Sequence, residues 1–123
     1  MIVGTVNARV EIVLPFAIAD STGHVHDMEA VLDTGFTGSL TLPPPFVAAL
    51  GLPWHSRSIA ILANGQIDAF EMHKATIVWD GAPRLILVQA SNTVPLVGLE
   101  LMTGNDLRVR FAPGGRAEIE KIL

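Results

Sequence analysis

One short stretch of the sequence places a carboxylate where it could act on a bound water. Residues 30–39 read Ala-Val-Leu-Asp-Thr-Gly-Phe-Thr-Gly-Ser, so an apolar run ends directly in Asp33, Thr34 and Gly35. A carboxylate can take a proton from water as a general base, and a glycine beside it allows close backbone approach. The same tripeptide is also ordinary turn chemistry, because Asp is frequent where a strand enters a turn. The predicted strands and turns around the motif are therefore needed to choose between these two interpretations.

Short strands and tight turns surround the motif. Asn64-Gly65 and Asp80-Gly81 supply the positive φ that hairpin turns need, and Asp20–Gly23 reads as a further turn. Alternating and β-branched runs predict strands at residues 9–19, 25–32, 39–42, 58–63, 66–79, 84–89, 107–111 and 117–123. Two short helices are predicted. One covers residues 45–50, where prolines begin the helix and Gly51 ends it, and the other covers residues 99–103 and ends at Gly104. This pattern predicts one all-β domain over residues 1–123, a barrel or a sandwich.

Composition excludes several classes of function. The formal net charge is −4 and no run of Lys or Arg is present, which argues against a nucleic-acid partner. The lack of cysteine excludes a thiol nucleophile and a thiolate metal site, and it fits a reducing compartment. Arg9 and Glu11 interrupt the apolar start, so we expect a strand there and no secretion signal. No apolar run approaches the roughly 18 residues of a membrane span, so we expect no membrane partner and a cytoplasmic location.

The histidines offer the main alternative chemistry, a metal site. His24 and His26 alternate along a predicted strand, with Asp27 and His73 elsewhere. A metal would need a third convergent ligand at a recognisable spacing, and the sequence has none. We therefore expect no metal and interpret His24 and His26 as solvated strand residues.

Three features resemble those of the retropepsin-like aspartic peptidases, particularly the small bacterial members that read Asp-Thr-Gly-Phe, and their order along the chain is that of the family. The first feature is the motif at residues 30–39. The second is Val-Pro-Leu-Val-Gly-Leu at residues 94–99, where the family passes two apolar residues and a glycine beneath the active-site loop into a short helix. The third is the predicted hairpin of residues 59–72, which lies where the family has its flap. The resemblance spans about residue 8 to about residue 111.

The resemblance implies a closed β-barrel subunit that hydrolyses peptide bonds without a cofactor. Asp33 would be the catalytic carboxylate, Thr34 would brace the loop across a two-fold axis, and Gly35 would donate its N–H to a carboxylate. Peptide hydrolysis needs one carboxylate to activate water and another carboxyl to act on the carbonyl oxygen, and two Asp about 3 Å apart share one proton. The chain holds one such motif and is too short for a two-lobed enzyme. The second Asp must therefore come from a second copy in a C2 homodimer.

The resemblance also implies which residues would contact an extended peptide or protein substrate. They follow the motif, form the flap tip or precede the second motif: Phe36, Thr37, Ala63, Asn64, Gly65, Val94 and Leu96. Phe36 and Thr37 stand where the better-known viral enzymes have Ala and Asp, and Leu99 stands where they have Arg. Two alternatives stay open. One is a catalytically weak or inactive peptide-binding or assembly module on the same fold, and the other is an unrelated β-barrel binding domain.

Overall fold

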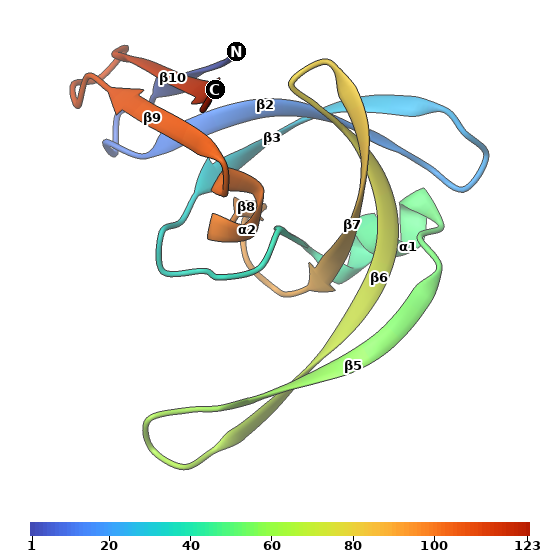
Figure 1. The fold of residues 1–123 in the computed structure, drawn as a ribbon. Coiled ribbons are helices and arrows are strands. Elements are labelled where there is room, and N and C mark those ends of the chain that lie inside the picture. The colour runs from blue at the N-terminus through green and yellow to red at the C-terminus, as the bar shows by residue number, and fades with distance from the viewer.

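Strands dominate the computed structural model, which describes residues 1–123 (Figure 1). Strands take up 54% of the chain and helices 9%, so the predicted all-β class is confirmed. The strands are β1 (Ile2–Val6), β2 (Ile12–Ala19), β3 (Val25–Leu32), β4 (Leu40–Leu42), β5 (Trp54–Ile61), β6 (Ile67–Trp79), β7 (Ala82–Ala90), β8 (Leu96–Val97), β9 (Asn105–Val109) and β10 (Arg116–Lys121). The two helices are α1 (Pro44–Leu50) and α2 (Leu99–Met102). Neither helix has the length and apolar character needed to cross a membrane.

Hydrogen bonds join all the strands into one sheet, in the order β5-β6-β7-β4-β8-β3-β2-β1-β10-β9. A further pairing of β2 with β6, at Ala17↔Val78 and Ile18↔Ile77, returns the sheet on itself. The strands β6, β7, β4, β8, β3 and β2 thus form a ring of six. From this ring β5 extends at one end, and β1, β10 and β9 extend at the other, where the two chain termini lie close together (Figure 1).

The core lies inside this ring. Alternate residues of β2 point inward, and Leu14 and Ile18 are fully buried, as the two-residue period of a strand requires. They pack with fully buried residues of facing strands, such as Leu42, Ile77 and Val88. Burying each such side chain contributes about 1.5–3 kcal/mol. The ring therefore encloses the packed core, and a site at the end of the ring can be held against that core.

The strand predicted at residues 9–19 was wrong in its bounds. It begins at Ile12, and a separate strand, β1, precedes it. The break has a local cause at Asn7, whose Oδ1 accepts the N–H groups of Arg9 and Glu11 at 3.0 and 2.9 Å. Val10 takes φ 61° in this turn, a conformation that a β-branched residue rarely adopts. Strand β2 consequently starts at Ile12 and not at residue 9.

Other strand ends also differ from the prediction, by up to four residues. Strand β5 begins at Trp54, four residues before the predicted start at residue 58. Strand β9 ends at Val109, because the turn to β10 starts at Arg110, whose N–H donates to the Arg116 carbonyl at 3.0 Å. Phe111, the last residue of the predicted strand, lies beyond its end and is exposed.

Candidate functional site

Strand β3 carries Asp33 to the end of the ring, directly beside β8. Val31 and Leu32 pair in parallel with Leu96 and Val97. The Asp33 N–H then donates to the Val97 carbonyl at 2.9 Å. The two sequence motifs, separated by about 60 residues in the chain, therefore lie side by side in the structure.

The loop that follows Asp33 is held at three points by the start of α2. Its carbonyl oxygens at Phe36, Gly38 and Ser39 accept N–H groups from Leu99, Glu100 and Gly98, at 2.9, 3.2 and 2.9 Å respectively. The contact is so close that a Cβ on Gly98 would collide with the Gly38 carbonyl oxygen. It would also lie 2.7 Å from the Phe36 carbonyl oxygen. Only glycine fits at position 98, and the loop conformation depends on it.

The Asp33 carboxylate is oriented by a hydrogen bond within its own loop and has no other side-chain partner in the chain. Its Oδ1 accepts the Gly35 N–H at 2.9 Å. Asp33 makes no other side-chain hydrogen bond and no ion pair, and it is half-buried. Thr34 is exposed, and its hydroxyl has no hydrogen-bond partner in the chain. The second oxygen, Oδ2, is thus available to a water or to another carboxyl.

The predicted substrate residues near the loop differ in exposure. Thr37 and Val94 are exposed, whereas Phe36 and Leu96 are half-buried. The Phe36 ring lies under the loop, where it would be 2.6 Å from a Cβ on Gly38. Leu96 is next to Val31 in the sheet. The structure therefore gathers Asp33, Gly35, Phe36 and Leu96 around one loop, with Thr37 and Val94 at its exposed margin.

The predicted flap is the hairpin of β5 and β6, which projects well beyond the ring (Figure 1). At its tip the Leu62 N–H donates to the Gln66 carbonyl at 2.7 Å, and the Gly65 N–H donates to the Leu62 carbonyl at 2.9 Å. The sequence predicted positive φ for both Asn64 and Gly65, but only Gly65 has it, at 83°. The tip is therefore a three-residue loop of Ala63, Asn64 and Gly65, and no hydrogen bond within the chain joins it to the Asp33 loop.

One face of this hairpin is apolar and open to solvent. Ile61 and Ile67 are direct cross-strand partners, and Ile59, two residues before Ile61, lies on the same face. Their exposed fractions are 77%, 67% and 65%. The hairpin can therefore offer both backbone hydrogen bonds and apolar contacts to an extended chain.

A polar cluster ties the two strands together at the base of the hairpin. The indole N–H of Trp54 donates to Glu71 Oε2 at 2.6 Å, and the Arg57 guanidinium donates twice to Glu71 Oε1 at 2.9 and 2.7 Å. The indole N–H first, and Arg57 second, hold the pKa of the Glu71 carboxyl below its ordinary value of 4.5. The ionised form of Glu71 is thus the form that joins the strands.

Acidification should loosen the hairpin through Glu71. A carboxyl whose pKa is lowered by folding contributes stability above its ordinary pKa, and this contribution is lost as the pH falls through the folded value. We expect amide hydrogen exchange in β5 and β6, corrected for intrinsic rates, to rise below about pH 4.5 and to rise less in a Glu71→Gln variant. Glu29→Gln, at an exposed carboxylate of β3 without a hydrogen bond, is the matched control and should behave as the wild type. If Glu71→Gln leaves the pH dependence of amide exchange in β5 and β6 unchanged, Glu71 does not have this role.

The histidines do not converge with further ligands. His26 Nε2 lies 2.8 Å from Asp20 Oδ2, and His24 Nδ1 lies 2.8 Å from the Thr22 hydroxyl. Hydrogen bonds from His26, and then from Thr22, hold the pKa of the Asp20 carboxyl far below its ordinary range. Both histidines are exposed, but each is tied to the Asp20–Gly23 turn and is not a free strand residue. The cluster fixes the turn between β2 and β3.

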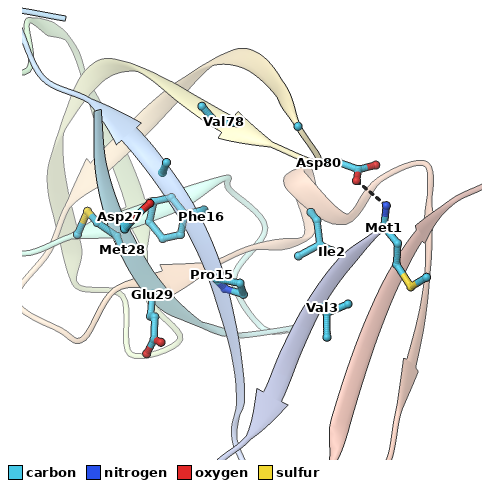
Figure 2. Close-up of a pocket in the computed structure, with 12 residues that line it drawn as sticks. Met1, Ile2, Val3, Pro15, Phe16, Asp27, Met28, Glu29, Val78 and Asp80 are labelled. Atoms are coloured by element: carbon cyan, nitrogen blue, oxygen red, sulfur yellow. Dashed lines mark hydrogen bonds and ion pairs between the residues drawn. The ribbon is translucent and has the colours of Figure 1, made fainter. Parts of the chain in front are cut away.

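A hollow of about 760 Å³ lies away from the candidate site. Figure 2 shows that β1, β2, β3 and the turn after Val78 line it, and that the Met1 amino group faces Asp80, 2.7 Å from Oδ1. Its other polar lining consists of Asp27 and Glu29. None of the predicted site residues lines this hollow, so its size alone does not connect it with the chemistry of Asp33.

Thr41 is a site-supporting residue that sequence reasoning did not find. It is buried in β4, and its hydroxyl oxygen accepts the Leu96 N–H at 3.0 Å. This bond positions β8, and through it the backbone that receives the Asp33 N–H. A Thr in a short apolar strand carries no local signal for such a contact, because its partner is 55 residues away.

No protein-family model matches the chain, and no curated protein matches it.

Proposed function

We propose that the chain is one subunit of a homodimeric aspartic endopeptidase of the retropepsin-like type, and that the ring of six strands is its closed barrel. The observation that carries the proposal is the Asp33 loop. Its carboxylate leaves a strand, accepts the Gly35 N–H, and sits in a loop held by the Gly98 segment of the second motif. An Asp that served only as a turn residue would not require this second, distant segment.

The proposed chemistry needs two Asp33 carboxyls, one from each subunit, facing each other across the two-fold axis. The ionised carboxyl takes a proton from a water molecule, and the water oxygen attacks the peptide carbonyl carbon. The protonated carboxyl gives its proton to the carbonyl oxygen, so a neutral tetrahedral diol forms. Collapse of the diol breaks the C–N bond: the carboxyl that gained the water proton protonates the leaving nitrogen, and the other carboxylate takes a proton back from a diol hydroxyl, which becomes the carbonyl of the product acid. The residues present supply every proton in this sequence, so no cofactor is required.

The substrate would be an extended peptide lying between the Asp33 loop and the hairpin of β5 and β6. Main-chain hydrogen bonds to the hairpin would hold it in the manner of an added strand. Phe36, Val94 and Leu96 are the expected apolar walls of the subsites, with Thr37 and the tip residues Ala63, Asn64 and Gly65 around them. We therefore expect a preference for apolar side chains beside the cleaved bond. The lack of cysteine supports a cytoplasmic location for this activity.

Activity should depend on dimer concentration and on pH. Each active site needs two chains, so specific activity towards apolar-rich peptides should fall on dilution as the dimer dissociates. One carboxyl must be protonated and the other ionised, so the rate should fall on both sides of an acidic to near-neutral optimum. Cleavage assays over a range of pH measure the second effect. Cleavage assays over a range of protein concentration, with sedimentation at the same concentrations, measure the first.

Three outcomes would contradict this proposal. A folded monomer with full specific activity would exclude the shared pair of carboxyls. Cleavage lost on addition of a chelator would point to a metal. Peptide binding without cleavage at any pH would instead favour the assembly or binding module.

A further inference from the structure

A second hollow, of about 750 Å³, lies beside the turn that joins β9 to β10. These two strands pair at one end of the sheet (Figure 1). The charged residues that line the hollow are Arg108, Arg110, Arg116 and Glu118. None of the residues proposed for peptide cleavage lines it. The hollow is therefore distinct from the candidate site around Asp33.

The register of the two strands places these four side chains on one face of the sheet. Arg108 is the cross-strand partner of Glu118. The Arg110 N–H donates to the Arg116 carbonyl at 3.0 Å, so Arg110 lies opposite Arg116 at the next outward position. Ala117, between Arg116 and Glu118, is buried, so its two neighbours point to the outer face. The outer face thus carries three guanidinium groups and one carboxylate, in two adjacent cross-strand pairs.

The positive charges in this group are not balanced within the chain. Arg116 Nε donates to Glu118 Oε1 at 2.7 Å. Neither Arg108 nor Arg110 makes a side-chain hydrogen bond or an ion pair. The hollow therefore carries a net charge of +2, in a chain whose formal net charge is −4. Like charges in directly opposed positions destabilise a sheet, and an anion bound between Arg110 and Arg116 would remove that cost.

The turn between the strands makes this arrangement of charges a property of the fold. A Cβ on Gly115 would collide with the Arg110 carbonyl oxygen and would lie 2.8 Å from the Ala112 carbonyl oxygen. Gly114 takes φ 80°, which favours glycine. The two glycines thus allow a tight turn that brings Arg110 opposite Arg116. The sequence alone shows no run of basic residues here, because the turn separates the two arginines.

The chemistry of the guanidinium groups indicates which anion fits. A guanidinium is planar, and its N–H groups form a fork that matches two oxygens of a carboxylate or a phosphate. The forks of Arg108 and Arg110 are unused, and Arg116 donates only through Nε. One carboxylate has a single charge and would occupy one fork. A phosphate monoester carries a charge of about −1.5 to −2 near neutral pH and has three acceptor oxygens, so it matches both the net charge and more than one fork.

Acidic neighbours limit the ligand to one such group. Asp106 and Glu120 are the next cross-strand pair on the same face, and both are exposed. A long polyanion that followed the strands from the hollow would meet these two carboxylates. Nucleic-acid binding involves several contacts, with about 6–10 phosphates in typical cases. The charge pattern therefore favours a single phosphate group that ends at the hollow.

We propose that the hollow formed by Arg108, Arg110 and Arg116 binds one dianionic phosphate group, carried by a small molecule or by a phosphorylated side chain of a peptide. This site does not depend on the proposed peptidase activity, and it adds a second binding function at the other end of β9 from α2. Its occupant neutralises the two opposed arginines of the turn.

Thermal unfolding with inorganic phosphate as the probe tests the site. A ligand that binds only the folded protein raises its melting temperature by mass action. At about 10 mM phosphate and a Kd of about 1 mM, we expect a rise of roughly 5 °C relative to chloride. Ionic strength and protein concentration are held constant, at about pH 7.5, because salt screens exposed charges. Acetate at the same ionic strength should raise the melting temperature by less than about 1 °C, because a carboxylate offers one charge and one pair of oxygens.

Three variants separate binding at the hollow from a general effect of charge. Arg110→Gln should abolish the phosphate-dependent rise, and its melting temperature in chloride should stay equal or increase, because a like-charge pair is removed. Glu118→Gln should enlarge the rise, because it removes the competing carboxylate and releases Arg116. Arg9→Gln is the matched control, since Arg9 is exposed, makes no side-chain hydrogen bond and does not line the hollow. It removes the same charge and should keep the full rise.

The outcomes decide the proposal in both directions. A wild-type protein that does not respond to phosphate, or responds equally to acetate, would overturn it. An equal loss in Arg9→Gln and Arg110→Gln would also overturn it, because binding would then follow net charge alone. The same assay with adenosine monophosphate and with a phosphoserine peptide identifies the carrier. A larger rise with one of them supports the site and names its source, and equal rises support a site that recognises the phosphate group only.

Discussion

Replacing Asp33 by Asn is expected to abolish peptide hydrolysis while the chain stays folded and dimeric. The amide keeps the size of the carboxyl and can still accept the Gly35 N–H that orients the loop. It cannot take a proton from water, and in a two-fold dimer both members of the pair are lost at once. Loss of general acid–base catalysis lowers the rate by about 10²–10⁴-fold, so we expect kcat to fall by about a thousandfold or more. The fall in kcat is measured from cleavage of an apolar-rich peptide at the pH optimum of the wild type.

Sedimentation and thermal unfolding of Asp33→Asn separate catalysis from folding. The dimer should persist, and its melting temperature should not fall, because the substitution removes the electrostatic cost of holding an ionised carboxylate against a second carboxyl group. Asp27→Asn is the matched control: it changes an exposed carboxyl of β3 outside the loop and should leave kcat unchanged. Activity of Asp33→Asn near that of the wild type would move the chemistry to another residue.

Most of the strands could be predicted from the sequence, because their signals are local. The alternation in β2 and the turn at Asp80-Gly81 follow directly from side-chain spacing and from positive φ, which Asp80 and Gly81 both adopt. The separate strand β1 was missed for an equally specific reason. Its boundary depends on the Asn7 side chain and on positive φ at Val10. The strand propensity of these residues predicts neither feature. The sequence alone predicts an uninterrupted strand there.

The residues of the candidate site could be named from the sequence, but the contacts that support the Asp33 loop could not. Asp33, Thr34 and Gly35 were selected because an apolar strand ends there in a recognisable turn. The bond from Leu96 to Thr41 and the pairing of β2 with β6 join segments far apart in the chain. Such contacts follow from how the whole sheet closes, so a local pattern cannot reveal them. The tip of the β5–β6 hairpin was predicted in part. The position of the turn was predicted correctly, but its three-residue form depends on the backbone hydrogen bonds of Leu62.

Gly98→Ala should disable the proposed site without touching Asp33, its proposed catalytic residue. The added Cβ would collide with the Gly38 carbonyl oxygen and approach the Phe36 carbonyl oxygen to 2.7 Å, and both atoms belong to the backbone of the Asp33 loop. The loop must therefore shift, because neither oxygen is the end of a flexible side chain. Overpacking of this kind costs about 1–3 kcal/mol of stability, and displacing a catalytic group by about 1 Å can cost about a hundredfold in rate.

Gly4→Ala is the matched control, because there too an added Cβ would meet a backbone carbonyl oxygen, that of Val13, in strands β1 and β2 away from the loop. Both variants should lose stability by comparable amounts in urea unfolding. Only Gly98→Ala should lose about a hundredfold in kcat/KM per folded dimer. The comparison is decisive because stability and activity are measured on the same two proteins. If both variants keep wild-type activity when folded, the loop geometry around Asp33 does not set the rate, and the support assigned to Gly98 is wrong.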